Sequence, residues 1–136
     1  MTENQSVSAD EDTICKLVED WAGAVRGHDL PAILRHHSAD MLMFDVPPPF
    51  LSRGIDAYAK TWDLFFAWVR DPIVFDIKEM DITAGNDVAF VTAAMQCAGA
   101  QPGAKVEALD FRLTIGLRKV DGHWTIVHEH HSVPAD

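Results

Sequence analysis

The stretch of the chain best suited to acid–base chemistry lies near its C-terminus. Residues 128–131 read His-Glu-His-His, so a carboxylate stands between imidazoles. Imidazoles change charge near neutral pH and carboxylates can accept or orient a proton, which suits general acid–base catalysis. A metal is the alternative use. On a strand, however, only two of these ligands would share a face, and a catalytic zinc site usually needs three protein ligands. We therefore expect no metal.

A β-hairpin is predicted to hold this cluster. Residues 108–119 alternate between polar and apolar types, Asp121-Gly122 is a turn signal, and a second strand-like segment follows. If the turn has two residues, Leu117 pairs with Ile126, and the pairing continues two residues at a time towards both ends. Such a register gives the hairpin one polar and one apolar face.

Each of the two predicted faces of the hairpin indicates a different function. The polar face is either a solvated outer surface or, if a helix covers it, the lining of a site, since successive side chains of a strand point to opposite sides; it contains Asp110, Arg112, Thr114, Glu129 and His131. The opposite face is large and apolar for a monomer, so it predicts a homodimer built through it; it contains Phe111, Leu113, Ile115, Leu117, Trp124 and Ile126.

Two aspartates are candidates for the chemistry. Asp110 and Arg112 lie two residues apart and share a face, so they form either a structural ion pair or part of a site. In a site, the arginine would keep Asp110 ionised, as an acceptor that orients a water molecule or a histidine. Asp45 stands between apolar residues and before Pro47-Pro48-Pro49. It either caps a turn or serves as a general base in an apolar cavity.

The elements that must position these residues indicate an α+β fold. Residues 1–9 are expected to be a disordered lead, and residues 10–134 a single domain. An apolar stripe predicts a first helix that starts near residue 10. A short second helix follows Asp29, and a third begins at Gly54. A strand is expected at Met41–Val46, between the second and third helices. After the third helix come the expected strands Ile73–Ile82 and Val88–Ala98, the loop Gly99–Gly103 and the hairpin. Three helices packed on a strongly curved, mostly antiparallel sheet can enclose a cone-shaped cavity that takes a ligand.

The composition of the chain excludes several classes of partner and cofactor. The 136 residues fit one domain, and the formal net charge of −10 disfavours nucleic acid and anionic membranes as partners. The polar N-terminus and the lack of a long apolar run predict a cytoplasmic protein. Cys15 and Cys97 are expected to be free thiols. A glycine-rich phosphate loop is lacking, so no organic cofactor is expected.

The element order over about residues 12–134 and the ending Asp121–Pro134 resemble the nuclear-transport-factor-two-like superfamily, in particular its SnoaL-like branch. The superfamily includes ketosteroid isomerase, and the resemblance implies a cone-shaped α+β barrel. It places Asp45 at that enzyme's general-base aspartate, and Asp110 at the protonated aspartate of its oxyanion hole.

The same resemblance shows departures from ketosteroid isomerase. Trp21, His37 and Trp62 stand where that enzyme has three hydrogen-bonded tyrosines, and His131 replaces a tryptophan that lines the cavity. The tyrosine donor of the oxyanion hole is therefore missing. Together with the charged Asp110–Arg112 pair, this points away from the known steroid isomerisation route and towards hydration, dehydration or anion binding.

The sequence thus predicts a small-molecule-binding protein, most simply a cofactor-independent enzyme of isomerase, hydratase, dehydratase or hydrolase type. Its substrate would be hydrophobic or carbonyl-bearing. The predicted catalytic residues are Asp45, Asp110, Arg112 and His131, and the predicted substrate-binding residues are Trp21, His37, Trp62, Phe66, Phe90 and Glu129. The alternative is a non-catalytic ligand-binding or oligomerisation module. A strongly shifted carboxylate beside an open cavity favours the enzyme, whereas a filled cone favours the module.

Overall fold

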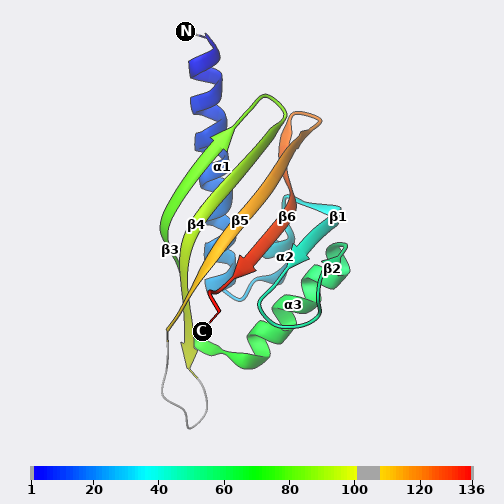
Figure 1. Cartoon of the computed structure of the whole chain (residues 1–136), viewed down its shortest axis with the longest axis vertical. Helices are drawn as coiled ribbons and strands as arrows, with labels where there is room; N and C mark the ends of the chain where they lie inside the picture. The colour runs from blue at the N-terminus through cyan, green and yellow to red at the C-terminus, as the bar shows by residue number, and fades with distance from the viewer. Residues whose placement is uncertain (1, 101–107, 136) are drawn as a thin grey trace.

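The computed structural model describes residues 2–100 and 108–135 and has the expected α+β fold (Figure 1). Two helices are followed by two strands and a third helix, and four consecutive strands then complete the described part of the chain. In order, the elements are α1 (Thr2–Arg26), α2 (Leu30–Leu34), β1 (His37–Phe44), β2 (Ser52–Arg53), α3 (Ile55–Trp68), β3 (Arg70–Ala84), β4 (Val88–Ala100), β5 (Leu109–Val120) and β6 (His123–Ser132).

All six strands form one sheet in the order β2-β1-β6-β5-β4-β3. Neighbours are antiparallel except β1 and β6, which run parallel. The sheet is strongly curved but not closed, so β2 and β3 are its free edges. Helix α1 crosses behind the long strands, and α3 lies beside β1 and β2 (Figure 1). The predicted curved, mostly antiparallel sheet with three helices is therefore confirmed.

The apolar stripe of α1 is the centre of the core, as the sequence predicts. Its members are at most 8% exposed: Ile14, Leu17, Val18, Trp21 and Val25. The helix begins at Thr2 and thus takes in the segment that was expected to be a disordered lead. Glutamate and glutamine in this segment have good helix propensity, which lets the helix continue before residue 10.

Local signals place the turns correctly. The Asp29 side chain accepts a hydrogen bond from the backbone N–H of Ala32 and caps α2. Asp121 and Gly122 both have positive φ, which the tight turn of a two-residue hairpin requires. Residues 99 and 100 belong to β4, and the rest of the loop expected at Gly99–Gly103 lies outside the described residues.

A β-bulge in β6 is the feature that the sequence pattern does not reveal. Leu117 pairs with Ile126 as predicted, but Gly116 pairs with His128, so Val127 is an extra residue without a partner. A bulge shifts every later side chain of its strand to the other face. The pairing of Leu113 is therefore with His131, and the predicted register is right next to the turn but wrong beyond the bulge.

The bulge exchanges the contents of the two faces. Before it, Trp124 and Ile126 point inward; after it, Glu129 and His131 are buried and His130 is exposed. The apolar face proposed for a dimer is also buried within the single chain, because every one of its members is at most 6% exposed: Phe111, Leu113, Ile115, Leu117, Trp124 and Ile126. The expectation that this face is free for a partner is therefore wrong.

Candidate functional site

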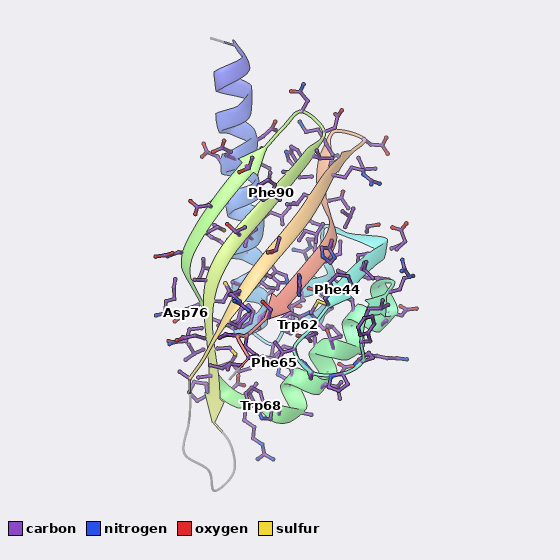
Figure 2. All side chains as sticks on the ribbon, viewed as in Figure 1. Phe44, Trp62, Phe65, Trp68, Asp76 and Phe90 are labelled. Atoms are coloured by element: carbon purple, nitrogen blue, oxygen red, sulfur yellow. The ribbon has the colours of Figure 1, made fainter. Side chains whose placement is uncertain are left out.

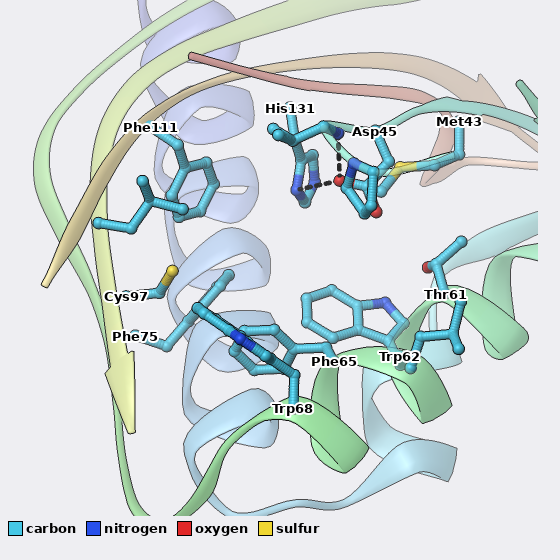
Figure 3. Close-up of a pocket in the computed structure, with 14 residues that line it drawn as sticks. Met43, Asp45, Thr61, Trp62, Phe65, Trp68, Phe75, Cys97, Phe111 and His131 are labelled. Atoms are coloured by element: carbon cyan, nitrogen blue, oxygen red, sulfur yellow. Dashed lines mark hydrogen bonds and ion pairs between the residues drawn. The ribbon is translucent and has the colours of Figure 1, made fainter. Parts of the chain in front are cut away.

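A cavity of about 460 Å³ lies between α3 and the inner face of the sheet (Figure 3). Its walls are mostly apolar and aromatic, and several elements contribute to them. The lining residues are Met43, Asp45, Val46, Pro47, Thr61, Trp62, Leu64, Phe65, Trp68, Phe75, Cys97, Leu109, Phe111 and His131. A cavity of this size with few polar groups is typical of small-molecule sites.

The polar groups of the cavity gather at one place. His131 Nδ1 lies 3.9 Å from Asp45 Oδ1, and Figure 3 shows this pair above the rings of Trp62 and Phe65. Asp45 directly follows β1, whose inward residues Met41 and Met43 are buried. The strand alternation thus carries Asp45 to the inner side, where the bulge in β6 also delivers His131.

Asp45 makes a turn contact and also lines the cavity, the two positions that its sequence interpretations require. Its Oδ1 accepts a hydrogen bond from the backbone N–H of Val46 at 2.8 Å, which is a local turn contact. Its side chain is 19% exposed and lines the cavity beside His131. The turn contact fixes the carboxylate without removing it from the reach of a bound molecule.

A fully buried carboxylate, Glu129, holds His131 from behind. His131 Nε2 lies 3.0 Å from Glu129 Oε1, and the other oxygen of Glu129 meets two further donors. The Tyr58 hydroxyl donates to Oε2 at 2.7 Å, and His37 Nε2 lies 2.5 Å from it. The indole N–H of Trp21 donates to the Tyr58 oxygen at 3.0 Å. The network therefore extends from the cavity to α1.

The electrostatics of this network favour an ionised carboxylate. Burial by itself raises the pKa of Glu129, but hydrogen bonds from His131 and His37 and positive charge on these imidazoles outweigh it and lower the pKa to about 2. Burial and the neighbouring Glu129 charge raise the pKa of Tyr58 well above 10. Tyr58 is therefore a neutral donor to Glu129, and its hydroxyl is not free to bind a ligand.

Other polar groups of the cavity are neutral. Burial, with the negative charges of Asp110 and Asp45, raises the pKa of the Cys97 thiol to about 11. A protonated thiol is a poor nucleophile and a weak donor. The Thr61 hydroxyl donates to the backbone of Tyr58 at 2.7 Å. The buried indole N–H of Trp62 has no hydrogen-bond partner within the described part of the chain.

The structure places Asp110 and Arg112 away from this site. Both are exposed on the outer face of β5, opposite the buried Phe111. Asp110 accepts a hydrogen bond from Gln96, and Arg112 donates to the Ser132 hydroxyl. The expectation that they share the cavity with Glu129 and His131 is wrong, because it depended on an unbulged register.

The predicted substrate-binding residues divide into three groups. Trp62 lines the cavity. Trp21, His37 and Glu129 lie behind the cavity wall, in the hydrogen-bond network. Phe66 stacks on His28 with ring centroids 3.8 Å apart, outside the cavity.

Phe90 is the clearest misplacement among them. It is 50% exposed on β4, near the opposite end of the sheet from Trp62 and Phe65 (Figure 2). Its strand reaches the cavity only further along, at Cys97.

Sequence reasoning missed several residues of the site. Phe75 and Cys97 form a cross-strand pair on β3 and β4 that lines the cavity, and strand parity alone could not rank this pair above its neighbours. Tyr58 could have been found. It is the only tyrosine of the chain and lies four residues before Trp62, on the same buried face of α3.

Within residues 2–100 and 108–135, no group of three or more potential ligands is arranged to hold a metal ion. In the same residues, no helix is long and apolar enough to cross a membrane.

Comparisons with known proteins agree with this fold. The fold is similar to that of an NTF2-like protein of unknown function from Pseudomonas putida KT2440, with 29% identity over 95% of this chain and 89% of that chain, and a TM-score of 0.85. A ketosteroid isomerase-like protein from Erwinia carotovora atroseptica has 22% identity over 90% and 96% of the two chains (TM-score 0.75). The association domain of C. elegans CaMKII has 18% identity over 94% and 98% (TM-score 0.76).

A comparison with functionally curated proteins finds no significant match. The family comparison is positive: residues 14–136 match the family described as SnoaL-like domain. This match covers most of the chain, including the bulged strand that carries Glu129 and His131. The chain therefore belongs to the SnoaL-like domain family, with an NTF2-like fold.

Proposed function

We propose that the protein is a cofactor-independent enzyme that moves a proton on a small, apolar, carbonyl-bearing molecule. The observation that carries this proposal is the pair of proton-exchanging groups, His131 and Asp45, at the polar end of an otherwise apolar cavity. Removing such groups from bulk water strengthens their electrostatic effect on a bound molecule.

The geometry supports distinct roles for the two groups. Asp45 would accept a proton from a carbon next to the carbonyl group. His131, held through Nε2 by Glu129, would donate its Nδ1 proton to the carbonyl oxygen. These two transfers give an enol. Return of the Asp45 proton to a different carbon, and of the oxygen proton to His131, gives an isomer.

The same arrangement supports dehydration. If the substrate carries a hydroxyl group on the second carbon from the carbonyl, Asp45 would give the proton it has accepted to this hydroxyl, which leaves as water. The enol oxygen would return its proton to His131, and the product is the conjugated carbonyl compound. Nucleophilic catalysis by Cys97 is disfavoured, because its thiol is protonated. Oxyanion stabilisation by Tyr58 is disfavoured too, because its hydroxyl donates to Glu129.

Turnover of apolar, cyclic β,γ-unsaturated ketones tests this proposal. Conversion to the conjugated ketone is followed by ultraviolet absorbance, and exchange of the α-protons in D₂O by NMR. We expect exchange above the buffer rate in the wild type and its loss in Asp45→Asn. Exchange that equals the buffer rate across the ketone panel, despite binding in the cavity, would refute the proposed proton transfer.

Binding is read separately by fluorescence. Trp62 and Trp68 line the cavity, so an apolar ketone that enters it should change the tryptophan emission. Binding without exchange would favour the second candidate, a non-catalytic ligand-binding or association module. The likeness to the CaMKII association domain supports this alternative.

Self-association stays a prediction, and light scattering at micromolar concentration checks it. The open cavity and the shifted Glu129 carboxylate next to it favour the enzyme over the module.

A further inference from the structure

We propose that His37 is a positioning residue: it carries the proton that balances the buried Glu129 carboxylate and thereby sets how strongly His131 holds its own proton. This inference rests on the proposed function for its catalytic meaning, because His131 is the proposed acid. His37 itself has no place in the cavity lining and does not meet a bound molecule.

A count of donors around Glu129 gives the first step. His37 Nδ1 lies 3.0 Å from the backbone oxygen of Arg35, which can only accept, so Nδ1 carries a hydrogen. The Tyr58 oxygen accepts from Trp21, and its single hydrogen is directed to Glu129. One proton therefore remains to be placed between His37 Nε2 and Glu129 Oε2.

The acidity of the carboxylate decides where that proton resides. The Tyr58 hydroxyl donates to Glu129, and two imidazole nitrogens lie within hydrogen-bond distance of its oxygens; in these surroundings the pKa of the carboxyl is lowered, so it holds a proton poorly. The proton is thus assigned to His37, which becomes an imidazolium with both nitrogens protonated. Both side chains are fully buried, so water does not screen the attraction between the two charges and has little access to remove the His37 proton.

His131 shares the same carboxylate through its other oxygen. With His37 charged, Glu129 is already balanced and attracts the His131 proton less. Without the His37 charge, Glu129 has only His131 to neutralise it, and His131 keeps its proton to higher pH. His37 therefore acts on the cavity through Glu129, across the wall of the site.

The other groups that face His131 do not replace this effect. Asp45 follows β1 and lies 3.9 Å away, and Cys97 on β4 is a neutral thiol. The Phe111 ring stacks on the imidazole at 5.5 Å between centroids, while two tryptophan rings meet it edge-on: Trp21 from α1 and Trp62 from α3. The charged neighbours are thus Asp45, Glu129 and, through Glu129, His37.

NMR of the histidine side-chain nitrogens in the wild type is the first test, and it needs no substrate. We expect His37 to show two protonated nitrogens across pH 5.5–8, as the donor count around Glu129 requires. A neutral His37 at pH 7 would overturn the proposal, whatever the fate of any variant.

The second test follows the His131 titration in folded His37→Gln, with His130→Gln as the control on the exposed outer face. Removing the His37 charge should move the His131 midpoint upward, because the Glu129 carboxylate then attracts the His131 proton alone. The control should leave it in place. An unchanged midpoint in folded His37→Gln would contradict the inference.

These readouts separate the two proposals. A wild type that exchanges no ketone proton but shows both NMR results would lose the proposed function and keep the charge assignment. Normal ketone exchange with an unshifted His131 midpoint in His37→Gln would retain the function and remove His37 from its control.

Discussion

The two faces of the β5–β6 hairpin carry the same kinds of side chain in opposite surroundings. On the inner face, Glu129 and His131 are buried and linked by a network of hydrogen bonds. On the outer face, Asp110 and Arg112 are exposed, and each bonds one polar neighbour. A solvated contact of this kind contributes little, because water competes for both partners. The difference shows that burial, set by one bulge, separates a candidate site from an ordinary surface.

The largest contrast is expected in stability. Glu129→Ala leaves two buried imidazoles and the Tyr58 hydroxyl without their acceptor, and should lower the free energy of unfolding by about 3–5 kcal/mol. Arg112→Ala, on the outer face, should change it by less than about 0.5 kcal/mol. Urea denaturation of both variants measures the difference. Equal losses would remove the energetic distinction between the two faces.

The two aspartates should differ in the rate of proton transfer. Asp45→Asn keeps the shape but removes the proposed base, so ketone exchange should fall by about 10²–10⁴. Asp110→Asn is the matched control and should keep the wild-type rate, since its side chain lies outside the cavity. If only Asp110→Asn lost activity, the result would support the site that the sequence pattern predicts without a bulge, in which Asp110 lines the cavity.

A fall in pH should reduce the stabilising contribution of the inner-face carboxylate Glu129 more than that of the outer-face carboxylate Asp110. The Glu129 pKa falls from its ordinary 4.5 to about 2 in the folded protein, so its stabilisation is complete above about pH 4.5 and is lost as pH drops towards 2. The loss is on the order of 3 kcal/mol. Comparing urea denaturation at pH 6 and pH 3, we expect a smaller acid loss in Glu129→Gln than in the wild type, and an unaltered one in Asp110→Asn.

The smallest contrast concerns two phenylalanines. Phe65→Ala removes a half-buried ring of the cavity wall and should weaken the binding of an apolar ketone by about 1–2 kcal/mol. Phe90→Ala, at the far end of the sheet, should leave the dissociation constant unchanged. Titration followed by tryptophan fluorescence gives both values, and equal weakening would argue against the cavity as the binding site.

Patterns with a short range were predictable from the sequence. The stripe from Ile14 to Val25, the Asp29 cap and the Asp121-Gly122 turn each follow from local spacing or backbone preference, and the structure has all three. The resemblance to the SnoaL-like branch added the curvature of the sheet, which local patterns do not contain.

The candidate site was predictable only in part, for a physical reason. The inward direction of Asp45 follows from β1 alone. The inward direction of His131 depends on the unpaired Val127, and no residue type marks a bulge there. Alternation was therefore continued across the bulge, which sent Glu129 and His131 to the side of Arg112. The sequence pattern identified the right cluster but joined it to the wrong partners.

Side-chain NMR of two neighbouring histidines tests the central claim most directly. His131 points into the cavity next to Asp45, whereas His130 is exposed on the other side of the same strand. On titration with an apolar cyclic ketone, we predict that the ring resonances of His131 shift with saturation and those of His130 stay in place. If the His130 resonances shifted with saturation while those of His131 did not change, the inner face could not be the side that binds and reacts with the ketone.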